Sequence, residues 1–86
     1  MSGSTVEIRE VHAFLVLAEE LSFARAAERL DMSQTALTRL IQKLERKVGV
    51  TLLHRTTRRV DLTRAGAGFR TVFGVIARRD DPPQTL

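Results

Sequence analysis

Apolar residues recur three and four positions apart along most of this chain, which is the spacing of helices that bury one face. The pattern predicts helices over residues 8–21, 22–30 and 33–48. Ser22 and Ser33 stand at the starts of the second and third helices, where a hydroxyl can cap free backbone amides. Because only a few residues join these two helices, we expect them to cross steeply, as in a helix-turn-helix.

The pattern changes after Gly49, which is placed to end the third helix in a left-handed conformation. Residues 52–54 and 60–62 have the short pattern of strands, and the polar run 55–59 predicts a turn between them. A last amphipathic helix follows over residues 64–79. The predicted fold is therefore mainly α: a winged helix-turn-helix with a three-helix core, a short two-stranded wing and a C-terminal linker or dimerisation helix.

The length of 86 residues indicates a single domain, since a chain this short cannot divide its core. We expect four parts along it. They are an N-terminal extension over residues 1–7, the winged helix-turn-helix domain over 8–63, the linker or dimerisation helix over 64–79, and a flexible tail over 80–86.

Charge is distributed far less evenly than the formal net charge of +4 suggests. Residues 1–32 hold six acids and three bases, whereas residues 33–79 hold eleven bases and two acids. This excess favours a polyanionic partner. Nucleic acid is favoured over a membrane because the bases are mostly arginine, without an aromatic and leucine insertion face. A basic surface that is merely solvated is the alternative from charge alone.

The composition excludes several other classes of protein. The chain has no cysteine, which excludes disulfides, thiolate zinc sites and cysteine nucleophiles. Its longest apolar run, from Ala13 to Ala18, is too short for a membrane span. Its two histidines have no carboxylate or nucleophile at an interpretable spacing, and so small a domain leaves little room for a substrate pocket. We expect a cytoplasmic, nucleoid-associated protein with no enzymatic activity, metal or cofactor.

The third predicted helix carries amides, hydroxyls and a guanidinium opposite its apolar face. With Leu37 set at zero, steps of about 100° per residue place the apolar positions from Ile41 to Val48 within about 40° of it. The polar positions fall between about 60° and 200°, and they are Gln34, Thr35, Thr38, Arg39 and Gln42. Such side chains read base edges in the major groove. An ordinary wet helix face is the alternative, but it would be rich in glutamate, and here no acid precedes Glu45.

The turn between the predicted strands holds three arginines in five residues, Arg55, Arg58 and Arg59. Such a tip can lie along phosphates or enter a narrow A·T-rich minor groove, and a solvated turn is the alternative. The full set of predicted DNA-binding residues is Ser33, Gln34, Thr35, Thr38, Arg39, Gln42, Lys43, Arg55, Arg58 and Arg59.

The last predicted helix supports a competing hypothesis. Its apolar stripe is suited to a core or to a dimer seam, for which the predicted residues are Phe69, Val72, Phe73 and Ile76. The chain would then be a protein-interaction or homodimerisation module whose basic face only aids solubility. RNA is a further possible target, but the absence of Tyr and Trp removes the usual stacking platform.

Residues spread over the whole chain together have the pattern of one protein family: Phe14, Ala18, Glu19, Ser22, Phe23, Ala26, Ala27, Leu30, Ser33, Gln34, Ala36, Leu37, Thr38, Arg39, Ile41, Leu44, Glu45, Gly49, Leu53, Arg55, Thr63, Ala65 and Gly66. With them the chain resembles, over residues 6–79, the N-terminal winged helix-turn-helix domain of the LysR-type transcriptional regulators. The resemblance implies a bacterial regulator that binds an interrupted palindrome in double-stranded DNA as a homodimer paired through its last helix. The base-reading positions that it implies are Gln34, Thr35, Thr38 and Arg39. The wing positions that it implies near the DNA backbone and minor groove are Arg55 and Arg58.

The sequence departs from the family pattern in three ways. Thr35 stands where the family usually has proline, which should loosen the start of the third helix. Leu40 stands where glutamine is frequent, which removes a polar group from that position. The family also continues through a longer linker helix into an effector-binding domain, so we expect no small-molecule effector site in this chain.

Overall fold

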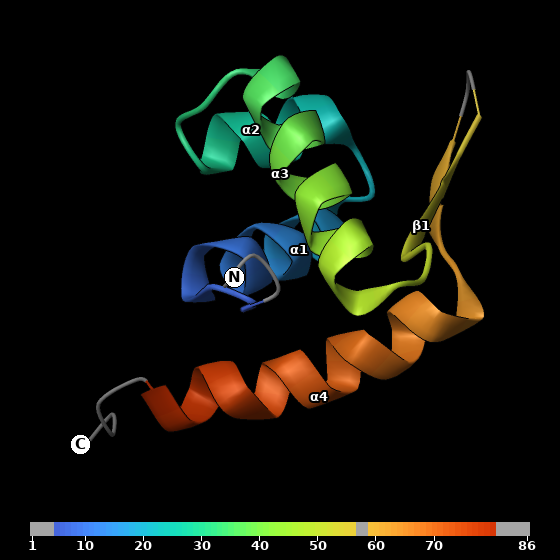
Figure 1. The fold of residues 1–86 in the computed structure, drawn as a ribbon. Coiled ribbons are helices and arrows are strands. Elements are labelled where there is room, and N and C mark those ends of the chain that lie inside the picture. Colours follow the sequence, from blue (N-terminus) through green and yellow to red (C-terminus); the bar gives the residue numbers. More distant parts are fainter. Residues whose placement is uncertain (1–4, 57–58, 81–86) are drawn as a thin grey trace.

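The computed structural model describes residues 5–56 and 59–80, and it contains four helices and a two-stranded antiparallel sheet in the predicted order (Figure 1). The elements are α1 (Ile8–Glu20), α2 (Phe23–Arg29), α3 (Gln34–Val48), β1 (Leu53–Arg55), β2 (Val60–Leu62) and α4 (Arg64–Asp80). The predicted fold class is confirmed. The predicted extension and tail lie mostly outside the described residues, in 1–4 and 81–86.

Most elements differ from the prediction by one residue at one end or both, and two of these differences move a predicted turn or tail residue into an element. Arg55, predicted in the polar turn, is the last residue of β1, where it pairs with Val60 of β2. The turn closes one residue later, because Thr56 and Arg59 bond to each other: the Thr56 N–H donates to the Arg59 carbonyl at 2.9 Å and the Arg59 N–H to Thr56 Oγ1 at 3.0 Å. Helix α4 continues to Asp80, the residue with which the predicted tail began.

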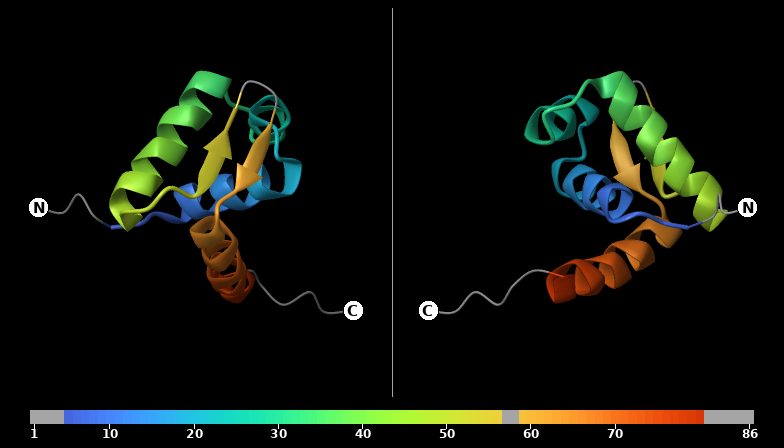
Figure 2. Two further views of the ribbon diagram at one scale, coloured as in Figure 1. Left: turned by 90° about the vertical axis from the view of Figure 1, so that its right-hand side faces the viewer. Right: turned by 60° about the vertical axis from the view of Figure 1, so that its left-hand side comes forward.

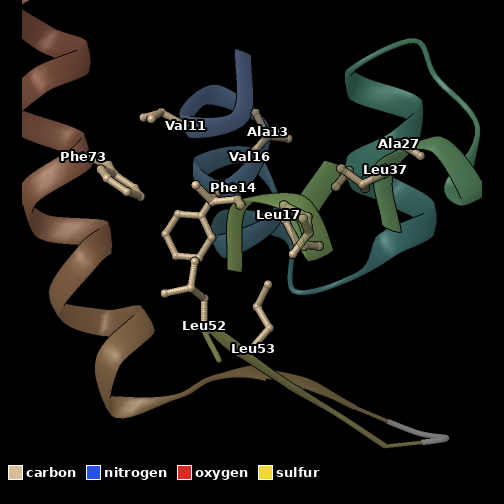
Figure 3. Packing of buried hydrophobic residues seen from close by; sticks show 13 residues of the cluster. Val11, Ala13, Phe14, Val16, Leu17, Ala27, Leu37, Leu52, Leu53 and Phe73 are labelled. Carbon is tan, nitrogen blue, oxygen red and sulfur yellow. The ribbon is translucent and has the colours of Figure 1, made fainter. Parts of the chain in front are cut away.

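Helix α1 forms the centre of the domain and lies between α4 on one side and the α2–α3 pair on the other (Figures 1 and 2). Its Phe14 and Leu17 are fully buried. The apolar faces of the other helices and the first residues of the wing pack around them. Leu37 of α3 and Leu52 before β1 are also fully buried (Figure 3). Burial of one stripe from each helix against α1 therefore holds the α2–α3 pair in place.

Side-chain caps begin the helices where the sequence predicts them. Ser22 Oγ accepts the Arg25 N–H at 3.2 Å, and Ser33 Oγ accepts the Ala36 N–H at 3.0 Å. Gly49 ends α3 in a left-handed conformation, with a φ of 78°. Because each cap supplies a partner for an otherwise free backbone group, it sets where its helix starts or ends.

The first residues of α4 are held against the wing by one threonine and one glycine. Thr63 Oγ1 donates to the Thr51 carbonyl at 2.6 Å and accepts the Gly66 N–H at 2.8 Å. The Thr63 N–H donates to the Leu52 carbonyl at 3.0 Å. A Cβ on Gly66 would collide with that same carbonyl oxygen, so only glycine lets α4 pass so close to the wing.

The apolar stripe of α4 faces α1, which changes the predicted dimer seam. The Phe73 ring packs edge-on against Phe14 with 5.8 Å between centroids, and it is only 6% exposed (Figure 3). Phe73 is thus part of this chain's own core, because the domain needs an apolar cover over α1. Phe69 packs beside it and is half-buried, whereas Val72 is 53% exposed. The side chain of Ile76 lies outside the described residues.

Candidate nucleic-acid interface

The polar face of α3 is free of contacts with the core and faces outward. Gln34, Thr35, Arg39 and Gln42 are exposed, as is Lys43, and Thr38 is half-buried at the edge of the face. The opposite face carries the fully buried Leu37, Ile41 and Leu44. The structure therefore brings together, on one side of one helix, the set that the sequence predicts to read bases. The hydroxyl of Ser33, which belongs to the wider set of predicted DNA-binding residues, is occupied as the cap of α3.

A tight turn between α2 and α3 directs the start of α3 away from the core. Asp31 takes a left-handed conformation with a φ of 56°, which a short polar side chain tolerates better than most. The Met32 N–H then donates back to the Ala27 carbonyl at 2.9 Å. The free amides in the first turn of α3 consequently lie at the surface, where they favour an anion such as a phosphate.

Two charged side chains near the other end of α3 turn inward and attach the helix to its neighbours. Glu45 Oε2 accepts the Leu52 N–H at 2.8 Å and the Leu53 N–H at 3.3 Å, which connects α3 to the start of the wing. Lys47 Nζ lies 2.9 Å from Glu10 Oε2, which connects α3 to α1. Sequence reasoning missed both roles. The sequence did contain a sign of the role of Glu45: it is the one acidic residue of α3, and it lies at the edge of the apolar stripe.

The Glu10 carboxylate is buried and ionised. Burial by itself raises the pKa of Glu10, but hydrogen bonds from the Glu7 N–H and from Lys47, together with the charges of Lys47 and Lys43, outweigh it and lower the pKa below the ordinary 4.5. Among the side chains that the structure describes, no buried polar atom lacks a hydrogen-bond partner. The inward-facing charges of this domain are therefore fully paired.

The wing is anchored to the helix-turn-helix by one of its arginines. The Arg55 guanidinium lies over the ring of Phe23, at the start of α2, with 4.6 Å between its central carbon and the ring centroid. Arg59 is 76% exposed at the side chain, and its Nε lies 3.3 Å from Asp61 Oδ2. Arg58, also predicted to bind DNA, lies outside the described residues. Arg55 of the wing therefore lies against α2, and Arg59 lies beside Asp61 of β2.

The acidic half of the chain is partly neutralised within itself. Arg29 of α2 bridges to Glu19 at 2.7 Å and Glu20 at 3.0 Å on α1, and these hydrogen bonds raise the pKa of the arginine. Arg29 is therefore not free to bind an anion. Within the described part of the chain, most of the helix-turn-helix cations without an ion pair lie on α3, and they are Arg39, Lys43 and Arg46.

The described part of the chain contains no group of three or more His, Cys, Asp or Glu side chains that could hold a metal ion. None of its helices has both the length and the hydrophobicity of a bilayer span. A groove of about 690 Å³ lies between α1 and α4 and includes Leu15 and Val75.

Comparison with known proteins gives a single result along most of the chain. Residues 8–67 match the family described as "Bacterial regulatory helix-turn-helix protein, lysR family". The chain is 48% identical over 68 residues to the HTH-type transcriptional regulator PgrR of Escherichia coli, covering 79% of this chain and 23% of that protein. It is 52% identical over 64 residues to the regulator AlsR of Bacillus subtilis, covering 74% of this chain and 21% of that protein. The chain thus spans less than a quarter of the length of these two relatives.

Solved structures of DNA complexes have the same fold. The DNA-binding domain of BenM in complex with the catB site 1 DNA superposes with a TM-score of 0.82 at 35% identity, covering 86% of this chain and 82% of that one. The DNA-binding domain of CbnR in complex with DNA superposes with a TM-score of 0.83 at 39% identity, covering 86% of this chain and 85% of that one.

Proposed function

This chain belongs to the lysR family of bacterial regulatory helix-turn-helix proteins, as a helix-turn-helix DNA-binding domain, and we propose that it reads a specific sequence in double-stranded DNA by placing α3 in the major groove. One observation carries the proposal: the polar face of α3 is exposed and free of acids up to Glu45, on a helix fixed by its buried opposite face. The family is regulatory, and we assign the domain no enzymatic activity. We place its action in the cytoplasm, on the nucleoid.

The side chains divide by the chemistry that they offer to a duplex. Four near the start of α3 would contact bases, since glutamine pairs with adenine, arginine pairs with guanine and a threonine methyl packs on the thymine methyl; these are Gln34, Thr35, Thr38 and Arg39. The rest would contact phosphates or the minor groove and so fix the position of the domain on the DNA; these are Ser33, Gln42, Lys43, Arg55, Arg58 and Arg59.

The two departures from the family pattern in α3 have different consequences. Leu40 is half-buried and packs against the core, so position 40 has no polar group to offer to DNA. Thr35 is exposed in the first turn, so its hydroxyl adds a hydrogen-bonding group where proline would have none. We infer that Thr35 contributes to this protein's own base preference.

We further propose that two copies bind together, through α4, on an interrupted palindrome. Because Phe73 lies in the core, the seam would be formed by the exposed Val72 and Val75, with the half-buried Phe69 at its edge. The groove between α1 and α4 borders the same surface. With both domains on one face of the duplex, the half-site centres would lie about one helical turn, or a multiple of it, apart.

Selection of bound duplexes from a random pool tests the proposal directly. We expect enrichment of one sequence, and Arg39→Ala should then weaken binding to it by about 1–3 kcal/mol and relax the preference at one base pair. Arg9→Ala is the control, since it removes one exposed positive charge from α1 instead of α3.

Two outcomes would contradict the proposal. If Arg39→Ala left affinity and base preference unchanged, the assignment of α3 as the reading helix would be wrong. If no duplex were enriched and the chain associated only with itself, the protein-interaction or homodimerisation module would be the better interpretation.

A further inference from the structure

A fully buried carboxylate is an unexpected component in a domain of this size. Glu10 is 0% exposed, and the side chain of its partner Lys47 is 7% exposed. Desolvating two charges has a large cost, and a buried ion pair is often no more stabilising than two well-packed apolar residues. Stability alone therefore does not explain why this pair is buried. A role in orienting the two helices does explain it, because a buried ion pair is favourable only in a narrow range of geometries.

The contacts of the pair determine the direction of the Lys47 side chain completely. Its ammonium donates to Glu10 Oε1 at 3.0 Å, to Glu10 Oε2 at 2.9 Å and to the Thr5 carbonyl at 2.7 Å. An ammonium has three N–H donors, so every donor has a partner. Glu10 Oε1 also accepts the Glu7 N–H at 2.9 Å, which ties the carboxylate to the start of α1.

Among the described residues, two side chains near the C-terminal end of α3 give it directional contacts: Lys47 bonds to Glu10 on α1, and Glu45 bonds to the Leu52 and Leu53 amides. The apolar residues of α3 belong to the same buried cluster as Phe14 and Leu17 of α1. Close packing resists large movements of α3, but apolar contacts have no hydrogen-bonding direction, so they tolerate a small rotation better than the two polar contacts do. With a side-chain radius of about 6 Å, a rotation of about 10° moves the tips on the polar face by about 1 Å. Binding groups need to be held within about 0.5 Å of their working geometry.

We propose that Glu10, through Lys47, is a positioning residue that fixes the rotation of α3 against α1, as Glu45 does against the start of the wing, and thereby contributes to the base preference of the domain. The inference rests on the proposed function. Glu10 touches no base in this scheme, because it lies on α1 and is fully buried. It acts on recognition indirectly, because it orients the Lys47 ammonium and so the helix α3 that carries it.

The exposed bridge of Arg29 to Glu19 and Glu20 provides the matched comparison. It also joins two helices through an ion pair, but it connects α2 to α1 and its side chains are 25% to 64% exposed. A long, exposed pair adjusts to rotation and is screened by salt. Glu19→Gln with Arg29→Gln therefore removes an interhelical ion pair while leaving α3 attached.

The test is the double variant Glu10→Gln with Lys47→Met, which keeps the net charge of the protein. The introduced glutamine still has an oxygen to accept the Glu7 N–H, and the introduced methionine keeps an apolar stem in place of the lysine. Affinity is measured for the selected duplex and for duplexes with single base changes, over a range of salt concentrations, and folding is followed by circular dichroism. We expect the ratio of affinities between selected and changed duplexes to fall about fivefold or more. The slope of log affinity against log salt should not change, because the phosphate contacts remain.

The outcomes separate this inference from the proposed function. No base preference in the wild-type chain would overturn both. A preference that is unchanged in Glu10→Gln with Lys47→Met, or equally reduced in Glu19→Gln with Arg29→Gln, would overturn the positioning role alone. If the double variant does not fold, Glu10→Asp takes its place: it keeps the charge but shortens the reach by one methylene, and an unchanged preference in that variant would also refute the inference.

Discussion

Several single residues of this domain each make contacts that hold two elements together. Thr63 caps α4 with the same hydroxyl that bonds to the Thr51 carbonyl before β1, and Glu10 caps α1 with the same carboxylate that holds Lys47 of α3. Gly66 allows the backbone of α4 to lie directly against the Leu52 carbonyl. A substitution at such a position disturbs two elements at once, so its cost exceeds that of an ordinary surface change.

The glycines of α4 should respond to alanine in opposite directions. Gly66→Ala places a methyl group against the Leu52 carbonyl oxygen, so we expect the free energy of unfolding to fall by about 2 kcal/mol or more. Gly68→Ala has open space and improves helix propensity, so we expect a gain of up to about 1 kcal/mol. Urea unfolding of the two variants measures both values, and a loss of stability in Gly68→Ala would contradict the geometry.

Glu10 should make the free energy of unfolding depend on pH in the acid range. Because its pKa is lowered in the folded state below the ordinary 4.5, its ionised form stabilises the fold above that value, and the contribution is lost as the pH falls through the lowered pKa. Unfolding free energies measured from about pH 6 downward should therefore decline more steeply in the wild type than in Glu10→Gln with Lys47→Met. Parallel curves for the two proteins would show that folding does not lower the pKa of Glu10.

At the scale of elements, α3 is held by its neighbours at both ends while its polar face stays free. The α2–α3 turn fixes its first residues, and the last turns are attached to α1 and to the residues before β1. The wing is attached in the same way at two places, through the Leu52 and Leu53 amides and through Arg55 on Phe23. Helix α3 and the start of the wing are therefore connected by directional contacts, and both carry predicted DNA-binding groups.

Removing the aromatic face under Arg55 tests how far the wing depends on that contact. Phe23→Leu keeps an apolar side chain against the core but removes the ring, whose interaction with a guanidinium at an exposed site contributes about 0.5–1 kcal/mol. We expect affinity to fall by about two- to fivefold for all duplexes alike, with base preference unchanged. A changed preference at particular base pairs would instead show that the wing takes part in reading the sequence.

For the whole molecule, the layered arrangement separates the two proposed binding surfaces. Helix α3 lies on one side of α1, and α4 lies on the other (Figure 2). An exposed apolar patch on α4 is therefore available to a second copy without covering α3. The patch is small, and Gly68 and Gly74 loosen its helix, so pairing in the absence of DNA should be weak.

Sedimentation of the chain without DNA checks this expectation. We expect weak, concentration-dependent self-association that Val72→Glu with Val75→Glu removes, since both side chains are exposed on α4. Val50→Glu is the control, because Val50 is a comparably exposed valine outside α4, two residues after the end of α3. A tight nanomolar dimer, or equal loss of association in Val50→Glu, would exclude the proposed seam.

Local patterns in the sequence were enough to predict the elements and the outward face of α3. Helical periodicity, serine caps and Gly49 depend on neighbours within one or two turns, so short stretches of sequence determine them, and α1 to α4 begin and end within a residue or two of the prediction. The same periodicity separates Leu37 from Arg39 on opposite sides of α3. Whether these residues bind DNA stays a prediction.

The tertiary structure alone decided which polar and aromatic side chains face inward. Glu10 and Lys47 are 37 positions apart, and nothing in their local sequence distinguishes them from solvated charges. Phe73 and Val72 are adjacent on α4, and the packing of that helix against α1 places the Phe73 ring on Phe14 while Val72 stays exposed. Contacts of this kind depend on how the helices pack across the core, and packing is a property of the whole chain, whereas periodicity is a property of each segment.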